Sequence, residues 1–366
     1  MRVNGRLRPS LPMLLVFALL FWLAPVAAHP PGLSSVDVIQ HPGNIELSAT
    51  FAVQDIEAFV PMDADLDAEV SPDELDAAKP GIAALMAQRL RLAVDGVEAA
   101  PDGLGETRFD DNNVHVTLHF SVAAGRDVSL QSGFPDLLPP GHQQFVRVTD
   151  ETGRTLVERL LNQDNSQLSW HVGEAAENTQ MASTFTDFFM LGVEHIVTGY
   201  DHLLFLLGLL LVTHSVWPAI KIITFFTIAH SITLALAGLN VIDVPPSIVE
   251  PLIAVTIVYV AVENLLRGEH PKGRHWLTFG FGLIHGFGFA SVLREMHIDS
   301  GDFGILVPLL SFNLGIEVGQ IAIAALVLPL IWQLNNRADI AAKLLPICSA
   351  IIGLAGFYWL LERTVL

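Results

Sequence analysis

The stretch GVEHIVTGYDHLLFLLGLLLV, residues 192–212, decides the fold of this chain. It is long and apolar enough to cross a bilayer, yet two acids and two histidines lie close together within it: Glu194, His195, Asp201 and His202. Ionisable groups are costly inside a membrane unless they are paired, so this cluster predicts a functional site. The alternative is that these side chains only join helices through hydrogen bonds.

Helix geometry limits how this cluster can bind an ion. Seven residues make nearly two turns, about 700°, so His195 and His202 share one face. Glu194 and Asp201 share the neighbouring face, and each like pair lies about 10 Å apart along the axis. A break at Gly199 would bring the two imidazoles together, whereas an unbroken helix would make them successive sites on a path. Imidazole with carboxylate suits borderline divalent metals such as Ni²⁺, Co²⁺ and Zn²⁺.

The rest of the C-terminal half repeats this apolar character. Mean hydropathy is +0.49 and only 16% of residues are charged, so a multi-pass α-helical membrane bundle is expected over residues 181–366. Six transmembrane helices are predicted at about 186–213, 220–239, 247–266, 276–294, 303–332 and 342–361. The first and fifth exceed a bilayer's thickness, so they are predicted to tilt or break. The expected weak points are Gly192, Gly199, Gly315 and Gly319.

The N-terminal half has a different character. Residues 1–28 read as a signal peptide, with three arginines, an apolar run and a small-residue site that predicts cleavage after Ala28. An uncleaved anchor helix is the alternative. Residues 29–180 are predicted to form a β-rich exported (periplasmic) domain with one helix near 72–90. The only cysteine is Cys348, so this domain holds no disulfide.

The exported domain is strongly acidic. Residues 29–180 hold 25 Asp and Glu against 8 Lys and Arg, a net charge of −17 (8 − 25) out of −19 for the chain. Nucleic-acid binding is therefore excluded, because such a surface repels phosphate. The charge serves either to collect cations or to keep the domain soluble.

Loop charges set the expected orientation. With residues 29–180 outside, six basic residues lie in inside loops: Lys221, Arg267, Lys272, Arg274, Arg337 and Lys343. Only Arg294 and Arg363 lie outside. This bias follows the positive-inside rule and places both ends of the mature chain on the outer face.

Other predicted spans also contain polar residues. His230, Glu263 and His285 are predicted to bind metal together with the first cluster. A secondary polar path is predicted from Thr227, Ser231, Thr233, Asn264, Asn313 and Glu317. Bonding between helices is again the alternative for these residues.

Three further motifs complete the pattern of the membrane half. They are Thr227-x2-His230-Ser231-x-Thr233, Glu263-Asn264 and His285-Gly286-x-Gly288-Phe289-Ala290. Together with His195-x5-Asp201-His202 they resemble the HupE/UreJ family of nickel permeases, from about residue 185 to the C-terminus, and in particular its long branch with an exported domain. The resemblance implies secondary uptake of Ni²⁺, or Co²⁺, across the bacterial cytoplasmic (inner) membrane. It also implies that the His/Asp motif handles the metal.

A second possible metal site lies in the exported domain. Residues 63–74 fit the twelve-residue EF-hand loop, with ligand positions at Asp63, Asp65, Asp67, Glu69, Ser71 and Glu74. Ala68 replaces the usual glycine at position 6, which weakens Ca²⁺ binding. The alternative is a helix start with Ser71 as cap and Glu74 at the third position.

Four functions fit these residues. Transport of a divalent metal ion leads, and because the chain has no Gly-x4-Gly-Lys-Ser/Thr sequence, it is expected to be secondary transport or to depend on a partner. The second is a zinc-dependent hydrolase inside the membrane, with four histidines on Zn²⁺ and Asp201 or Glu263 activating water. The third is a haem-binding electron carrier. The fourth is an assembly factor that hands metal to an exported partner of unknown identity. Membrane lipid is the other expected partner.

Overall fold

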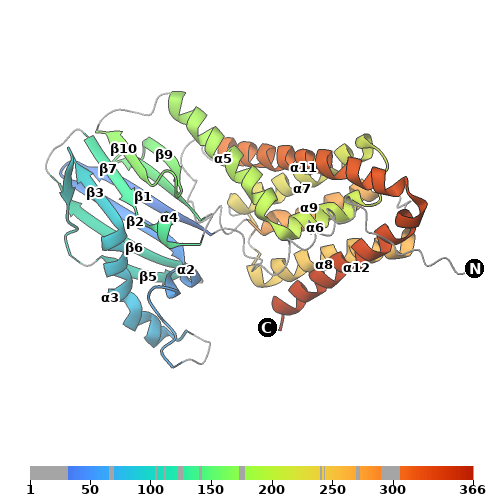
Figure 1. Ribbon diagram of the computed structural model, residues 1–366. Coiled ribbons are helices and arrows are strands. Elements are labelled where there is room, and N and C mark those ends of the chain that lie inside the picture. Colours follow the sequence, from blue (N-terminus) through green and yellow to red (C-terminus); the bar gives the residue numbers. More distant parts are fainter. Residues whose placement is uncertain are drawn as a thin grey trace, which may run out of the picture.

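A computed structural model gives the structure of the protein. It describes residues 32–65, 70–103, 105–110, 113–122, 127–139, 142–172, 178–239, 241–242, 244–268, 273–289 and 306–365. The predicted signal peptide and its cleavage site lie outside these residues. A β-rich part is followed by a helical part, as expected, and the two lie side by side (Figure 1).

The β-rich part is a sandwich of two sheets. The larger sheet has the order β5-β6-β2-β1-β8-β9 and the smaller β10-β7-β3-β4. The strands are β1 (Leu33–His41), β2 (Asn44–Ala52), β3 (Leu90–Val94), β4 (Val97–Ala99), β5 (Glu106–Asp110), β6 (Asn113–Ser121), β7 (Asp127–Ser132), β8 (Gln143–Asp150), β9 (Thr155–Leu161) and β10 (Gln167–His171). Alternating residues of both sheets fill the core, with β1 paired to β8 in parallel and to β2 antiparallel.

Three helices complete this part: α2 (Val53–Glu57), α3 (Pro72–Arg89) and α4 (Phe134–Leu137). The helix predicted near 72–90 is thus confirmed as α3. It begins with a capping box, in which Ser71 accepts a hydrogen bond from the backbone N–H of Glu74 while Glu74 accepts one from that of Ser71. Buried Ile82 and Met86 hold α3 against the sandwich core.

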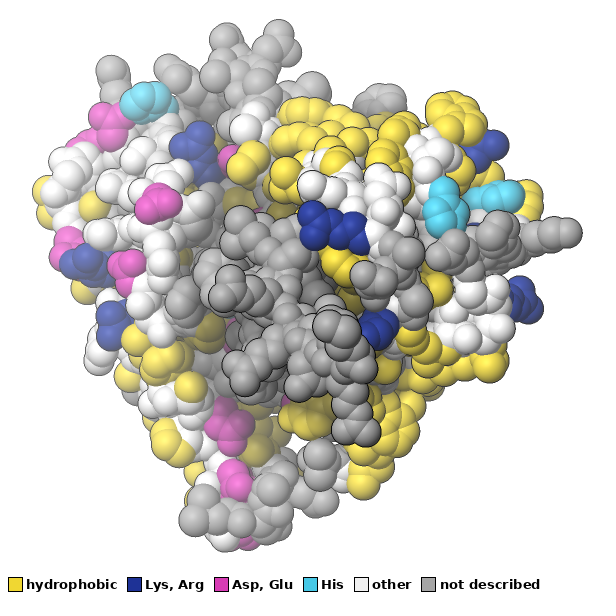
Figure 2. All heavy atoms as spheres, turned by 45° about the vertical axis from the view of Figure 1, so that its right-hand side comes forward, with side chains coloured by type: hydrophobic (Ala, Val, Ile, Leu, Met, Phe, Trp, Pro, Cys, Tyr) yellow, Lys and Arg dark blue, Asp and Glu magenta, His cyan; other side chains and the backbone are white. Residues whose placement is uncertain are grey.

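The helical part consists of α5 (Asn178–Thr198), α6 (Tyr200–Leu210), α7 (Val216–Gly238), α8 (Pro246–Arg267), α9 (Arg274–Phe287), α11 (Leu306–Asn335) and α12 (Ala338–Glu362). Large hydrophobic side chains are exposed along α7, α8, α11 and α12, which is the surface that a bilayer would cover. Figure 2 shows hydrophobic side chains gathered over this part, whereas Asp and Glu side chains lie mainly over the β-rich part.

The prediction of six spans is confirmed only in part. Four described helices, α7, α8, α11 and α12, are long and apolar enough to cross a membrane, and the bent pair α5–α6 makes a fifth. The fourth predicted span, 276–294, corresponds to α9, which has 14 residues and is about 21 Å long. Residues 290–294 lie outside the described part of the chain.

The predicted break in the first span occurs at Gly199. The axes of the two helices on either side of it meet at 70°. Gly199 is in an extended conformation, and a Cβ atom there would lie 2.7 Å from the carbonyl oxygen of His195 and 3.0 Å from Nδ1 of His202. Only glycine therefore fits at this point of the bend.

The other glycines predicted as weak points are not breaks. Helix α11 runs unbroken through Gly315 and Gly319, and α5 runs unbroken through Gly192. A Cβ atom on Gly192 would overlap the carbonyl oxygen of Phe312, and one on Gly315 that of Phe189. The prediction was wrong because these small residues let α5 and α11 pack backbone to backbone.

This close packing gives a stability prediction. Gly192→Ala is expected to lower the free energy of unfolding by about 1–3 kcal/mol, because the added methyl group forces α5 and α11 apart. Gly280→Ala is the control, since a Cβ atom there meets nothing within 4 Å. Thermal unfolding of the purified protein in detergent measures both, and equal melting temperatures would contradict the packing described.

A second prediction concerns the stability of the β-rich domain in acid. Burial lowers the pKa of His142 from 6.5 to about 4. The folded domain therefore takes up this proton only near pH 4, whereas the unfolded chain takes it up near pH 6.5. Above pH 6.5 the neutral His142 makes its full contribution to the free energy of unfolding. This contribution, about 3 kcal/mol in total, is lost as the pH falls to 4.

The urea midpoint of unfolding, measured between pH 7 and 4, tests this pH dependence. Unfolding is followed by the fluorescence of Trp170, with the other tryptophans replaced by Phe. We expect the midpoint to fall steeply in the wild type and less steeply in His142→Gln. Identical pH profiles would show that another group dominates.

Candidate metal centre

The break at Gly199 brings His195 and His202 into contact. Their ring centroids lie 4.8 Å apart, half the separation expected along an unbroken helix. His230 of α7 joins them, with its ring 6.3 Å from that of His195 and 6.4 Å from that of His202. All three are buried, and each offers a ligand nitrogen within 4.8 Å of the others. Three predicted metal residues from two predicted spans thus form one site.

The hydrogen bonds of these histidines show which nitrogens are free. Nδ1 of His202 lies 3.0 Å from Oδ1 of Asp201, and Nδ1 of His230 lies 3.1 Å from Oδ1 of Asn313. Both oxygens accept, so each Nδ1 carries the proton and each Nε2 keeps its lone pair. The Nε2 atoms of His195, His202 and His230 are all buried, and none has a hydrogen-bond partner among the residues that the structure describes. Unpartnered buried acceptors in one place are unfavourable unless a cation fills the gap.

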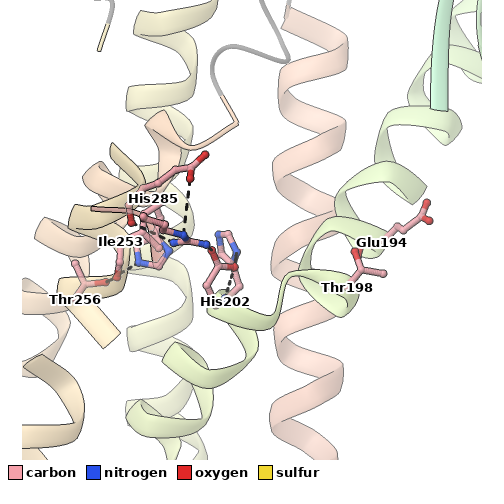
Figure 3. A network of polar contacts seen from close by, with 9 residues as sticks. Glu194, Thr198, His202, Ile253, Thr256 and His285 are labelled. Carbon is pink, nitrogen blue, oxygen red and sulfur yellow. Dashed lines mark hydrogen bonds and ion pairs between the residues drawn. The ribbon is translucent and has the colours of Figure 1, made fainter. Parts of the chain in front are cut away.

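His285 of α9 adds a fourth imidazole. Its ring centroid lies 5.1 Å from that of His202. Thr256 of α8 donates its hydroxyl hydrogen to the carbonyl oxygen of Ile253, so it accepts a hydrogen bond from Nε2 of His285 at 2.8 Å. Nδ1 of His285 is then the lone-pair nitrogen, and it is buried without a hydrogen-bond partner in the described part of the chain. Figure 3 shows His285 and Thr256 on the same side of the bend as His202.

The surroundings favour a cation over other ligands. Phe289 and Phe312 pack on His195 with ring centroids 4.9 and 5.4 Å away, which keeps water out and strengthens electrostatic interactions. Helix α5 ends at the bend, where α6 begins, and α9 ends two residues after His285, so the ends of three helices lie near the site. Asp201 supplies a full negative charge behind His202.

Two predicted metal residues lie elsewhere. Glu194 precedes His195 but points away from the histidines, and its carboxylate accepts a hydrogen bond of 2.6 Å from Nε2 of Gln143 in the β-rich domain (Figure 3). Glu263 pairs with Arg267 at 3.3 Å and lies seven residues from Thr256 along α8, about 10 Å away. The structure therefore does not bring either carboxylate into the histidine cluster.

The residues of the predicted polar path fall into three groups. Asn313, Thr227 and Glu317 take part in contacts between α7 and α11. Ser231 and Thr233 instead donate to carbonyl oxygens of their own helix, as exposed or helix-embedded hydroxyls often do. Asn264 holds α6 and α8 together by donating to the carbonyl oxygen of Gly208 at 2.8 Å.

Three functional residues have roles that the sequence did not indicate. Thr256 fixes the tautomer of His285, and only its place within a span hints at this. Arg274 and Arg363, counted only as loop charges, are buried in the bundle. Arg274 donates to Asn264, and Arg363 approaches Asp201.

The EF-hand-like loop is described in part. Carboxylate oxygens of Asp63, Asp65 and Glu74 lie within 4.8 Å of one another, whereas Asp67 and Glu69 lie outside the described residues. Glu74 is also the capping residue of α3, and hydrogen bonds from Ser71 and Ala64 lower its pKa to about 2. The alternative of a capped helix start is thus present, and Ca²⁺ binding stays a prediction.

The fold and the centre together define a multi-pass membrane protein with a buried cluster of histidines whose nitrogens are close enough together to hold a metal ion. The family model described as HupE / UreJ protein matches residues 172–363, slightly more than half of the chain. The chain therefore belongs to the HupE/UreJ family, as its motifs predicted, and this family transports or handles nickel and cobalt. No curated protein matches the sequence.

The hydrogen bond behind His230 gives a prediction for the purified protein. Asn313→Ala removes the acceptor that fixes the tautomer of His230, so the affinity for Co²⁺ is expected to fall about 10- to 100-fold. Ser231→Ala is the control, because that hydroxyl bonds only to its own helix among the contacts of the described residues. Isothermal titration with Co²⁺ measures the affinity of both variants. Equal affinities would show that Asn313 does not support the site.

Proposed function

We propose that this chain carries Ni²⁺, with Co²⁺ as a second substrate, across the bacterial cytoplasmic membrane as a secondary transporter. One observation carries the proposal: three buried histidines offer converging nitrogens, and their Nε2 atoms have no other partner in the described part of the chain. Neutral imidazole is a preferred ligand of both ions. Membership of the HupE/UreJ family supports metal as the cargo.

The broken span supports movement of the ion rather than permanent storage. Many secondary transporters place their substrate at a discontinuous helix near the middle of the membrane, where half-helix ends face the ion. Here His195 lies in the last turn of one half-helix and His202 in the first turn of the other. A change in the angle at Gly199 therefore moves two ligands relative to each other and loosens the site.

A polar seam extends from the centre along α7 and α11. Asn313 contacts His230, Glu317 accepts a hydrogen bond of 2.8 Å from Thr224, and the Thr227 hydroxyl contacts Gln320 at 3.3 Å. On α11 these residues span seven positions, about 10 Å of helix. With residues 29–180 outside, the seam leads from the centre towards the cytoplasm and offers the ion oxygen ligands on its way.

The hydrolase alternative has less support from the same geometry. It needs a carboxylate that is free to activate a metal-bound water. Asp201 accepts from His202 and faces Arg363, while Glu263 pairs with Arg267 away from the histidines. Neither of the two predicted carboxylates is thus placed as a base.

Uptake of ⁶³Ni²⁺ into cells tests the proposal. Cells that express the wild type are expected to accumulate nickel, and His202→Ala is expected to abolish this because one of three converging ligands is lost. His275→Ala is the control, since His275 packs against Phe225 and Trp276 in another part of the bundle. Competition by Co²⁺ and Zn²⁺ ranks the ions by preference, with the variants compared at matched levels of protein in the membrane. No wild-type uptake above background for any of these ions would refute the proposal.

A further inference from the structure

Arg363 at the end of α12 is a buried cation behind the metal centre. Its side chain is 9% exposed and lies between two carboxylates, 3.7 Å from Oδ2 of Asp201 and 3.8 Å from Oε2 of Glu250. One of its terminal nitrogens donates to the backbone carbonyl of Glu250 at 3.1 Å. The ring of Trp359, one turn earlier on α12, lies 5.9 Å from the guanidinium carbon.

The contacts of Arg363 with the two carboxylates are loose. Both distances exceed the length of a hydrogen bond, so the two carboxylates hold the guanidinium by charge, whereas among the described residues the Glu250 carbonyl is its directional partner. A bidentate Arg–carboxylate pair would be expected if the purpose were to join the helices firmly. The arrangement instead places a positive charge close to Asp201 without a tightly hydrogen-bonded ion pair.

Asp201 connects this charge to the histidines. Its Oδ1 accepts from Nδ1 of His202, and its Oδ2 faces Arg363. A carboxylate behind an imidazole raises the donor strength of the far nitrogen, here the free Nε2. A guanidinium on the other side of the same carboxylate opposes that effect, and it also repels a divalent ion directly.

We propose that Arg363 is a positioning residue that lowers the affinity of the histidine centre for its metal ion, so that the ion can leave. This inference rests on the transport function proposed above. A transport site must bind weakly enough to release its ion, whereas four imidazoles backed by a carboxylate would hold a transition metal tightly. Arg363 resolves this conflict without occupying a ligand position.

Affinity and transport measured together test the inference. Purified Arg363→Gln is expected to bind Ni²⁺ with a Kd about tenfold lower than the wild type, because a nearby positive charge is gone. In cells, the same variant is expected to show a lower KM and a lower maximal rate of ⁶³Ni²⁺ uptake, since release becomes slow. Arg363→Lys keeps the charge and is expected to restore both values. Arg337→Gln, at the exposed opposite end of α12, is the control that should leave them unchanged.

A purely structural role gives different results. If Arg363 only joins α12 to α6 and α8, Arg363→Gln lowers the melting temperature and leaves Kd equal or raises it, which overturns the inference. Glu250→Gln is a second variant that keeps Arg363 and its backbone acceptor. It removes a compensating negative charge, so the Kd is expected to rise about threefold, and an unchanged Kd likewise overturns the inference. If the wild type binds and transports Ni²⁺ in these experiments, the proposed function stands. If it does neither, both the proposed function and the role of Arg363 are refuted.

Discussion

Gly199 breaks a membrane span, and the metal centre depends on that break. A continuous helix would hold His195 and His202 two turns apart, with no way to act on one ion. Interrupting a helix in a membrane leaves backbone groups without partners, which is costly unless the ends are closed locally. Here the N–H of Gly199 donates to the carbonyl of His195, and the N–H of Leu203 donates to that of Gly199. The N–H of His202 donates to its neighbour Asp201, so three N–H groups at the 70° turn have acceptors.

The remaining ligands depend on how closely the helices approach this bend. His230 and His285 come from α7 and α9, which pack together where a Cβ atom on Gly286 would overlap the Thr233 hydroxyl. Helix α11 brings Asn313 to His230 only because it lies backbone to backbone with α5. In lipid, such close packing replaces the hydrophobic effect as the force that joins helices. These glycines therefore affect the histidine site indirectly, because they set how closely the helices approach one another.

The sequence predicts which side chains gather better than it predicts their arrangement. Residue type and apolar context were enough to select His195, His202, His230 and His285, because an ionisable side chain inside a membrane span is costly unless it has a partner or a function. The direction of a bend is not encoded in helical periodicity, so Glu194 and Asp201 were expected on one face and lie apart. The loop charge of Arg363 gave no sign of its contact with Asp201, which lies 162 positions earlier (363 − 201).

The β-rich domain is joined to α5, the half-helix that carries His195. Phe145 packs on Phe188 of α5 with ring centroids 5.9 Å apart, and Gln143 donates to Glu194. Leu33 and Leu160 belong to the same apolar cluster, which continues through α5 as far as Phe289 and Phe312 beside His195. One side of the joint at Gly199 is thus fixed to the β-sandwich, while α6 on the other side is buried among the helices. Helix α5 also packs backbone to backbone on α11, so the half-helix that carries His195 lies between the β-sandwich and the bundle. The β-rich domain is thus in direct packing contact with the element that carries one of the clustered histidines.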